Sequence, residues 1–328
     1  MQPYRFGIVG TGMIANKFAE AAKVLGDRMI VQAVSSRTLA KAQDFSDRHG
    51  IPDVYGSYED MALATDIDVA YIATPHNFHL AHMELYAAHH KHILCEKPIV
   101  VNEAEATRLL QLSERYKIFI MEAYWSIFVP AFAKFQELFS LRGSDRWDFL
   151  RSEIGFSHPG DRGLRKVDPA LAGGALLDVG VYNLMIAAEV FGYGFQITDV
   201  HTIKNEQGID VFDAFTLDHG NGRKSYNICT VKGKMTNELI VFGPEGCLIL
   251  KNFLGSQSVV EDRLGETPVE YQFPFLANGY EYEINHVCDC LDQGFLQSDQ
   301  LPLAKSVKII RAADVIRQRI GLKYGFEN

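Results

Sequence analysis

A glycine-rich turn lies near the start of the chain and reads Gly10-Thr11-Gly12-Met13-Ile14-Ala15. It stands between the apolar run Phe6–Val9 and a helical stretch from about Ile14 to Leu25. In a G-x-G-x-x-A turn, Gly10 allows the tight bend, Gly12 lets the backbone approach a pyrophosphate, and Ala15 permits close helix–strand packing. The helix start, with Met13 and Ile14, adds unpaired N–H groups and the positive end of the helix dipole. A plain glycine loop is the alternative, but the strand–turn–helix setting favours a dinucleotide site.

The rest of the first third continues this alternation of strands and helices. Short apolar runs, typical of strands buried on both faces, are Ile30–Ser35, Val69–Ala73, His92–Cys95 and Phe119–Glu122. Helical stretches between them are Leu39–His49, His79–Ala88 and Ala104–Tyr116. Alternating strands and helices form right-handed crossovers and a parallel sheet. We therefore predict an α/β chain whose residues 1–122 form a doubly wound Rossmann domain that binds a dinucleotide.

Residues 123–328 follow a different rhythm and are predicted to form a second domain. Helices are expected at Pro130–Phe139, Ala172–Phe191 and Lys305–Ile320. Strands without intervening helices are expected at Ile197–Ile203, Phe212–Leu217, Ser225–Val231, Glu238–Phe242 and Cys247–Leu250. The last two are joined by Gly243-Pro244-Glu245-Gly246, which is typical of a hairpin. This pattern predicts an α+β domain for substrate binding and dimerisation, with an open-faced, mostly antiparallel sheet.

The end of the second expected strand indicates which dinucleotide binds. A carboxylate there would accept the adenosine ribose hydroxyls and repel a 2′-phosphate. The sequence instead reads Val34-Ser35-Ser36-Arg37, and the Arg37 guanidinium can pair with a phosphate through its fork of N–H donors. Ser36 and Arg37 therefore favour NADP(H) over NAD(H), with a plain surface arginine as the alternative.

Composition narrows the class of partner. The chain has 328 residues, and its 32 basic against 41 acidic residues give a net charge of −9. Without a run of five or more Lys and Arg residues, we expect neither nucleic acid nor membrane as a partner. The five scattered cysteines are not typical of a disulfide framework, and no signal peptide is visible. We therefore expect a cytoplasmic protein that acts on a small molecule.

Three further segments carry a resemblance to a known family. They read Thr74-Pro75-His76-Asn77-Phe78-His79, then Cys95-Glu96-Lys97-Pro98, and then AGGALLDVGVY over residues 172–182. With the glycine-rich turn, they resemble the Gfo/Idh/MocA oxidoreductases over nearly the whole chain. Glu122-Ala123-Tyr124-Trp125 and Asp168-Pro169-Ala170-Leu171 look most like the dimeric dihydrodiol dehydrogenases and the NADP-dependent D-xylose dehydrogenases.

The resemblance implies transfer of a hydride between a nicotinamide and a carbinol or carbonyl carbon of a sugar, cyclic polyol or trans-dihydrodiol. By the matching positions, Lys97 would lie beside the nicotinamide, and Pro98 would follow a cis peptide bond. Asp178 and Tyr182, four residues apart, would share a helix face. Further groups expected at the cofactor are Thr74, Pro75, His76, Asn77, His79 and Glu96. For His79 and His82, however, the residues themselves favour packing roles over catalysis.

Alcohol oxidation needs a base for the hydroxyl proton while hydride leaves the carbon. Free tyrosine and lysine, with pKa values near 10, are poor bases at neutral pH. A nearby ammonium favours a phenolate and stabilises negative charge on the reacting oxygen. We therefore assign Tyr182 as proton carrier, Lys97 as its electrostatic partner and Asp178 as an orienting group. The reverse assignment, with Lys97 as base, stays open.

Other candidate residues concern the substrate pocket. Trp125, Phe128 and Phe156 are candidates for its apolar wall, with plain packing as the alternative. His158, Arg162 and Arg165 precede the Asp168-Pro169 loop and could reach the substrate. Tyr182 stands where inositol dehydrogenases of the family carry histidine, which disfavours an inositol substrate. Asn183, where relatives often have Cys or Pro, leaves the identity of the substrate open.

We expect no metal site. A metal site in the imidazole-rich stretch of His76, His79, His82, His89, His90 and His92 is not expected. In His286-x-Cys288-x-Cys290, alternate residues on a helix point about 200° apart and cannot share a tetrahedral ion.

Two questions stay open beyond the site itself. A catalytically silent, NADP(H)-responsive regulator on the same scaffold is the alternative function, although retention of Lys97, Asp178 and Tyr182 together favours the enzyme. The open sheet predicts a homodimer, with a tetramer as the alternative.

Overall fold

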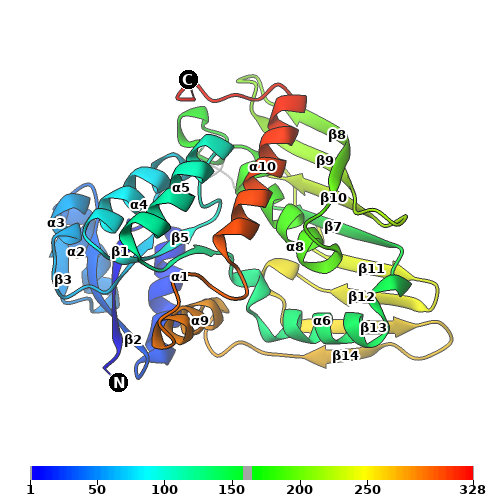
Figure 1. Cartoon of the computed structure of the whole chain (residues 1–328), viewed down its shortest axis with the longest axis horizontal. Coiled ribbons are helices and arrows are strands. Elements are labelled where there is room, and N and C mark those ends of the chain that lie inside the picture. Colours follow the sequence, from blue (N-terminus) through cyan, green and yellow to red (C-terminus); the bar gives the residue numbers. More distant parts are fainter. Residues whose placement is uncertain (1, 158–164, 328) are drawn as a thin grey trace. The chain divides into compact units, whose positions relative to one another are not determined.

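The computed structural model describes residues 2–157 and 165–327 (Figure 1). The chain forms two compact units, one of Met1–Trp125 with Phe275–Val307 and the other of Ser126–Pro274 with Lys308–Asn328. The first break lies close to the expected boundary after residue 122. From the sequence, Phe275–Val307 was expected in the second domain. In the structure it belongs to the first unit. It joins the first unit because helix α9 (Tyr280–Asp292) packs on helix α1 (Met13–Ala22).

The first unit contains a six-stranded parallel sheet in the order β3-β2-β1-β4-β5-β6. Its strands are β1 (Tyr4–Val9), β2 (Met29–Ser35), β3 (Asp53–Tyr55), β4 (Val69–Ile72), β5 (His92–Glu96) and β6 (Ile120–Ala123). Its further helices are α2 (Leu39–His49), α3 (Tyr58–Ala62), α4 (His79–Ala88) and α5 (Glu103–Tyr116). This is the doubly wound dinucleotide-binding order, so the predicted Rossmann fold is confirmed. The sequence pattern missed β3 and α3 because elements this short show no clear period.

The second unit contains an eight-stranded sheet in the order β14-β13-β12-β11-β7-β10-β9-β8. Its strands are β7 (Phe149–Gly155), β8 (Gln196–Lys204), β9 (Asp210–Asp218), β10 (Lys224–Thr230), β11 (Leu239–Gly243), β12 (Gly246–Leu250), β13 (Ser258–Arg263) and β14 (Val269–Gln272). Only the β7–β10 pair is parallel among these described strands, which confirms a mostly antiparallel sheet. The predicted hairpin is present, with Gly243 opposite Gly246.

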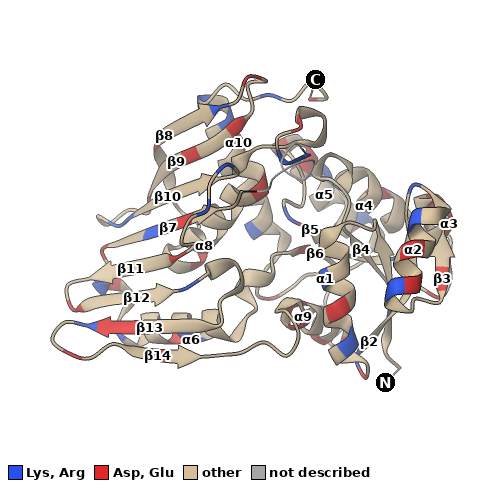
Figure 2. Ribbon diagram, turned by 180° about the vertical axis from the view of Figure 1, so that it is seen from behind, with Lys and Arg blue, Asp and Glu red and all other residues tan. Residues whose placement is uncertain are grey.

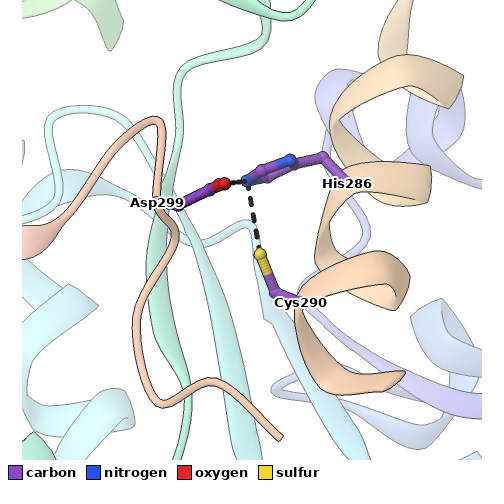
Figure 3. Close-up of side chains that lie close together, drawn as sticks. All are labelled: His286, Cys290 and Asp299. Carbon is purple, nitrogen blue, oxygen red and sulfur yellow. Dashed lines mark hydrogen bonds and ion pairs between the residues drawn. The ribbon is translucent and has the colours of Figure 1, made fainter. Parts of the chain in front are cut away.

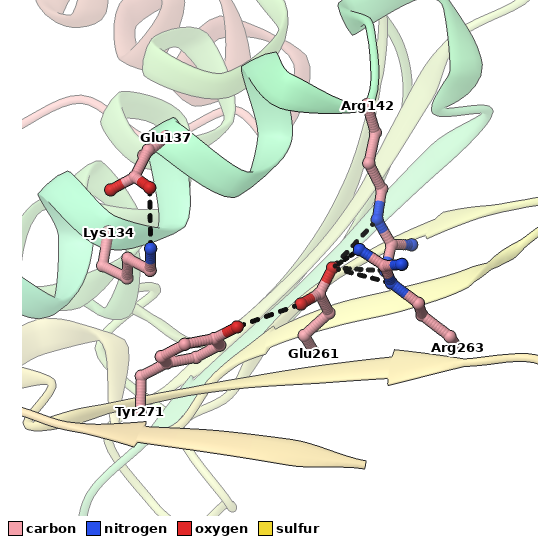
Figure 4. Close-up of polar contacts among 6 residues, drawn as sticks. All are labelled: Lys134, Glu137, Arg142, Glu261, Arg263 and Tyr271. Atoms are coloured by element: carbon pink, nitrogen blue, oxygen red, sulfur yellow. Dashed lines mark hydrogen bonds and ion pairs between the residues drawn. The ribbon is translucent and has the colours of Figure 1, made fainter. Parts of the chain in front are cut away.

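Helices α6 (Pro130–Leu141) and α8 (Val181–Phe191) lie on one face of this sheet (Figure 1). Figure 4 shows how the C-terminal end of α6 is tied to β13. The buried Glu261 carboxylate accepts hydrogen bonds from Arg142, Arg263 and Tyr271. The two guanidinium groups keep the pKa of Glu261 low despite the opposing effect of burial.

The last helix, α10 (Leu303–Arg319), passes from the first unit to the second. One helical stretch, Pro169–Phe191, is apolar and long enough to cross a membrane by composition alone. In the structure 83% of the most apolar 18-residue part of this stretch is buried, as expected for a helix in the core of a unit. In the view of Figure 2, basic and acidic residues are scattered with no extended basic block.

Candidate active site

The glycine-rich turn has the geometry that a pyrophosphate needs. Gly10 has a φ of +102°, and a side-chain carbon there would lie 3.0 Å from the Ala73 carbonyl oxygen, so only glycine fits. Helix α1 begins at Met13, and its N-cap residue Gly12 provides no side-chain cap; the first turn contains no acidic residue. Its first N–H groups are therefore available to a phosphate. Ala15 is fully buried, as the third small position of the motif requires.

The end of β2 borders this turn. The Ser36 hydroxyl lies 3.4 Å from the Thr11 hydroxyl, which joins the strand end to the turn. Arg37 follows as an exposed residue directly before helix α2. Its charge acts on the Tyr58 hydroxyl, so the guanidinium lies near the start of α3. Ser36 and Arg37 thus lie where the adenosine ribose is held in the Rossmann fold.

Two loops at the carboxyl ends of β4 and β5 are joined by the buried His79 ring. Its Nδ1 lies 2.9 Å from the Pro98 carbonyl oxygen, and its Nε2 lies 2.9 Å from that of Thr74. The ring therefore links the Thr74–Asn77 loop to the Glu96-Lys97-Pro98 loop. Lys97 is half-buried, and the bond before Pro98 is cis, as predicted. No part of the His79 surface is exposed, so the ring holds the two loops together from inside the unit.

Buried carboxyl groups lie around the Lys97 loop. The Glu96 carboxylate accepts a hydrogen bond of 2.5 Å from Tyr71, and burial raises the pKa of Glu96 to about 7. Glu122 accepts the Ile99 N–H at 3.0 Å, while burial raises its pKa also. Glu283 of α9 is fully buried, so its pKa lies well above the usual value. Sequence reasoning assigned Glu96 only to the cofactor and did not foresee these groups.

In the second unit, the segment of residues 172–182 depends on its glycines. A side-chain carbon at Gly174 would lie 2.2 Å from the Asp210 Oδ1, and one at Gly173 would lie 2.6 Å from the Asp168 N. At Gly180, it would lie 2.8 Å from the Cys229 sulfur of β10. The three glycines therefore allow the helix that carries Asp178 and Tyr182 to lie directly on the sheet and its neighbouring loop.

The helix changes its hydrogen-bond pattern at the candidate catalytic residues. Leu176–Gly180 form a π-helical turn, in which the Val181 N–H donates to the Leu176 carbonyl, and α8 continues from Val181. Such turns are frequent at functional sites. Asp178 lies inside the π-helical turn, and Tyr182 lies in the first turn of α8 with 4% of its surface exposed.

Asp178 has a partner that sequence reasoning missed. The Lys166 Nζ lies 2.5 Å from the Asp178 Oδ2, and the same ammonium lies 6.0 Å from the centre of the Phe156 ring. A lysine twelve residues upstream has no sequence signal that marks it for this role. Phe156, Lys166 and Asp178 thus form one group on this unit. Arg165 is exposed beside it, whereas His158 and Arg162 lie outside the described residues.

The N-terminus of the π-helical turn is held by a buried pair of acids. The Leu176 N–H donates to the Asp210 Oδ2 at 2.7 Å, and neither Asp210 nor Asp213 is exposed. Burial and the neighbouring Asp210 carboxylate raise the pKa of Asp213 to about 9. Asp213 is therefore a neutral acid at pH 7, next to the carboxylate that anchors the helix.

Asp213→Asn should raise the free energy of unfolding relative to wild type, and the difference should grow as the pH rises. Between about pH 4 and 9 the unfolded chain has already lost the Asp213 proton that the folded chain retains, so wild-type stability falls as pH rises. The neutral asparagine removes this effect, and its advantage should grow by on the order of 1 kcal/mol per pH unit. Melting temperatures at pH 5, 7 and 9 measure it. The exposed Asp199→Asn is the control, and parallel pH curves for Asp213→Asn and wild type would refute the prediction.

The remaining candidates are aromatic or amide residues. Trp125 is half-buried and stacks on Tyr280 with ring centres 4.8 Å apart, which is a packing contact inside the first unit. Phe128 is also half-buried but belongs to the second unit. Asn183 is fully buried and donates to the Ser152 hydroxyl of β7 at 2.7 Å. Asn183 therefore fixes α8 on the sheet, which explains a polar residue on this apolar helix.

A Rossmann unit with an open phosphate turn, followed by a unit built on a large mixed sheet, defines a dinucleotide-binding oxidoreductase. Residues 4–124 match the family model of the GFO_IDH_MocA oxidoreductases with an NAD-binding Rossmann fold. The chain is 32% identical to human trans-1,2-dihydrobenzene-1,2-diol dehydrogenase over 98% of both chains. It is 33% identical to the mouse protein of the same name, again over 98% of both. The chain belongs to the Gfo/Idh/MocA oxidoreductase family and is a dehydrogenase or reductase.

Solved structures show the same fold at lower identity. The aldose-aldose oxidoreductase of Caulobacter crescentus superposes with a TM-score of 0.85 at 21% identity, covering 97% of this chain and 98% of the other. A 3-ketoreductase from Actinomadura kijaniata, in complex with NADP and TDP-benzene, has a TM-score of 0.85 at 20% identity, covering 96% and 97%. Both likenesses support the two-unit architecture along the whole chain.

Proposed function

We propose that this protein is an NADP-dependent dehydrogenase that oxidises the carbinol carbon of a trans-dihydrodiol, with a sugar or cyclic polyol as the next candidate class. The observation that carries the proposal is the full-length identity of about a third to dihydrodiol dehydrogenases. Retention of the Lys97, Asp178 and Tyr182 motifs supports it. Gly10, Gly12, Met13 and Ile14 would hold the pyrophosphate of NADP, with Ser36 and Arg37 at the 2′-phosphate, and the nicotinamide, when bound, would supply the hydride acceptor.

In the proposed reaction, Tyr182 takes the hydroxyl proton of the substrate while the carbon loses its hydride, which leaves a carbonyl. The Lys97 ammonium favours the phenolate and stabilises charge on the reacting oxygen. Asp178 orients the substrate or the Lys97 ammonium. Its own carboxylate is held by Lys166, whose Nζ lies 2.5 Å from the Asp178 Oδ2. Thr74, Pro75, His76 and Asn77 would contact the cofactor, and Trp125, Phe128 and Phe156 would form the apolar part of the substrate pocket.

Turnover tests the proposed function directly. NADPH fluorescence during incubation with NADP and a panel of trans-dihydrodiols, aldoses and cyclic polyols should rise for at least one diol. A chain that binds NADPH but turns over no member of the panel would instead support the silent regulator. Inositol should be a poor substrate, because Tyr182 replaces the histidine of the inositol dehydrogenases.

Arg37→Ala should weaken NADP binding by on the order of 10- to 100-fold and leave NAD binding nearly unchanged. A charge-assisted hydrogen bond to the 2′-phosphate is lost, and NAD has no phosphate there. Titration of both cofactors by intrinsic fluorescence measures the two dissociation constants. Arg115→Ala is the control, because Arg115 is an exposed arginine in the last turn of α5. An unchanged preference for NADP would remove Arg37 from the cofactor site.

We further propose a homodimer in which a second copy covers the open face of the eight-stranded sheet. Phe149 and Tyr226 on this face are 41% and 47% exposed, and Phe149 stacks on Phe242 with ring centres 4.6 Å apart. Aromatic residues that form such a patch are typical of interfaces. All five cysteines are free thiols, which supports our separate proposal of a reducing, cytoplasmic setting for the protein.

Tyr226→Glu should therefore convert the protein to a monomer, because it would bury a charge in the interface. Light scattering after gel filtration at micromolar concentration measures the mass. Leu264→Glu is the control, since Leu264 is 83% exposed in the turn between β13 and β14. A monomeric wild type would contradict the proposed dimer, and a tetramer would require a second interface.

A further inference from the structure

A cluster of potential metal ligands lies in the first unit, apart from the residues assigned to catalysis. It consists of His286 and Cys290 on α9 and Asp299 in the connection to α10 (Figure 3). Cys288 is not part of the cluster, because its sulfur lies 4.0 Å from the Arg28 carbonyl oxygen. His286 and Cys290, in contrast, are four residues apart and lie on the same helix face. Folding of the connection adds Asp299, which no spacing rule connects to α9.

The His286 Nε2 is the centre of this cluster. It lies 3.4 Å from the Cys290 sulfur, 3.7 Å from an Asp299 carboxylate oxygen and 2.7 Å from the Ser298 hydroxyl. The Ser298 oxygen accepts the N–H groups of Gln300 and Leu301, so its own hydrogen points to His286. Since Nε2 accepts that hydrogen, it carries the lone pair of a neutral imidazole.

These separations suit a tetrahedral ion. Zinc bonds of about 2.0 to 2.1 Å to nitrogen or oxygen and about 2.3 Å to sulfur place neighbouring ligand atoms about 3.3 to 3.6 Å apart. The two measured distances from Nε2 are close to that range, and all three ligand atoms lie within 4.8 Å of one another. The Asp299 side chain is 66% exposed, so the carboxylate can adjust and an ion can enter from solvent.

The donor set also selects the kind of ion. A thiolate and an imidazole favour zinc and similar thiophilic ions over magnesium or calcium, which prefer oxygen ligands. One thiolate and one carboxylate balance a double positive charge. We propose that His286, Cys290 and Asp299 bind one Zn²⁺ ion per chain, with a water molecule as fourth ligand. Binding replaces the S–H bond of Cys290 by a metal–sulfur bond and releases one proton to solvent, while a metal–nitrogen bond at the His286 Nε2 replaces the hydrogen bond from Ser298.

A bound ion would fasten the residues 293–302 connection to α9. The expected role is to stabilise the first unit, because the ion joins two segments that otherwise meet through hydrogen bonds. Affinity should increase with pH, since the Cys290 thiol must lose its proton to bind the ion. The Asp299 carboxylate faces the same ion, and Asp289 also lies near enough to act on the His286 ring.

Cobalt provides the sharpest test because its bond to thiolate absorbs in the near ultraviolet. Untagged, reduced, chelator-treated full-length protein should show a thiolate-to-Co²⁺ charge-transfer band that saturates at one ion per chain and disappears on adding Zn²⁺. Cys290→Ser should abolish the band. Asp299→Asn, at an exposed position that does not threaten folding, should weaken Co²⁺ binding by on the order of tenfold or more.

Two cysteine variants serve as matched controls. Cys288→Ser, on the same helix, and Cys247→Ser, in the second unit, should retain the band and its saturation point. A wild type without a saturable band would overturn the proposal. So would a band that persists in Cys290→Ser or an Asp299→Asn protein that binds Co²⁺ as tightly as wild type.

Discussion

Tyr182→Phe should lower kcat by on the order of 10³, because general acid–base groups contribute about 10²- to 10⁴-fold and phenylalanine cannot exchange a proton. The affinity for NADPH should stay within about twofold, since the substitution removes one oxygen from the second unit and none from the dinucleotide turn. Tyr182 is only 4% exposed, so the isosteric ring should preserve packing. Stopped-flow fluorescence separates the hydride-transfer step from cofactor binding.

Tyr193→Phe is a matched control for this loss. Tyr193 follows α8, and its hydroxyl donates to Glu189 on the same helix, so its removal leaves the proposed chemistry intact. The control should retain wild-type turnover. If Tyr182→Phe keeps more than about a tenth of the wild-type kcat, Tyr182 is not the proton carrier.

Lys97→Met should also lower kcat by on the order of 10³, since it removes the cation that favours the phenolate and stabilises the reacting oxygen. Methionine has a similar length and no charge, so the loop that His79 joins to Thr74 should keep its position. The pH dependence of kcat/KM separates the two open assignments. With Lys97 as electrostatic partner, the variant should still show one ionisation, moved to higher pH; with Lys97 as base, that ionisation should disappear.

Lys117→Met is the control at an exposed lysine beyond the end of α5. It should leave kcat and the pH profile unchanged. A Lys97→Met protein with wild-type turnover would contradict the proposed mechanism. Wild-type protein that is inactive on every substrate, with NADPH binding intact, would favour the regulator.

Much of the fold was predictable because buried parallel strands are continuous apolar runs and the helices between them have a clear helical pattern of apolar residues. Leu39–His49 and His79–Ala88 were predicted with the same bounds that the structure shows for α2 and α4. Strand β7, in contrast, reads FLRSEIG, and its arginine, serine and glutamate hide the alternation of buried residues. Helix α9 was not predicted as a helix, and its residues were placed in the second domain because their partner, α1, lies far away in sequence.

For the candidate site, the sequence by itself determined which turn residues must be small, and it predicted the residues proposed to carry a proton. The requirement for glycine at position 10 and the E-K-P triplet are local, so a short stretch of chain contains the whole signal. Only the tertiary structure decided which polar groups surround them. Lys166 beside Asp178, Asp210 beside Leu176 and Asp299 beside His286 come from other elements or connections of the chain, and side-chain contacts of that kind form only when elements pack.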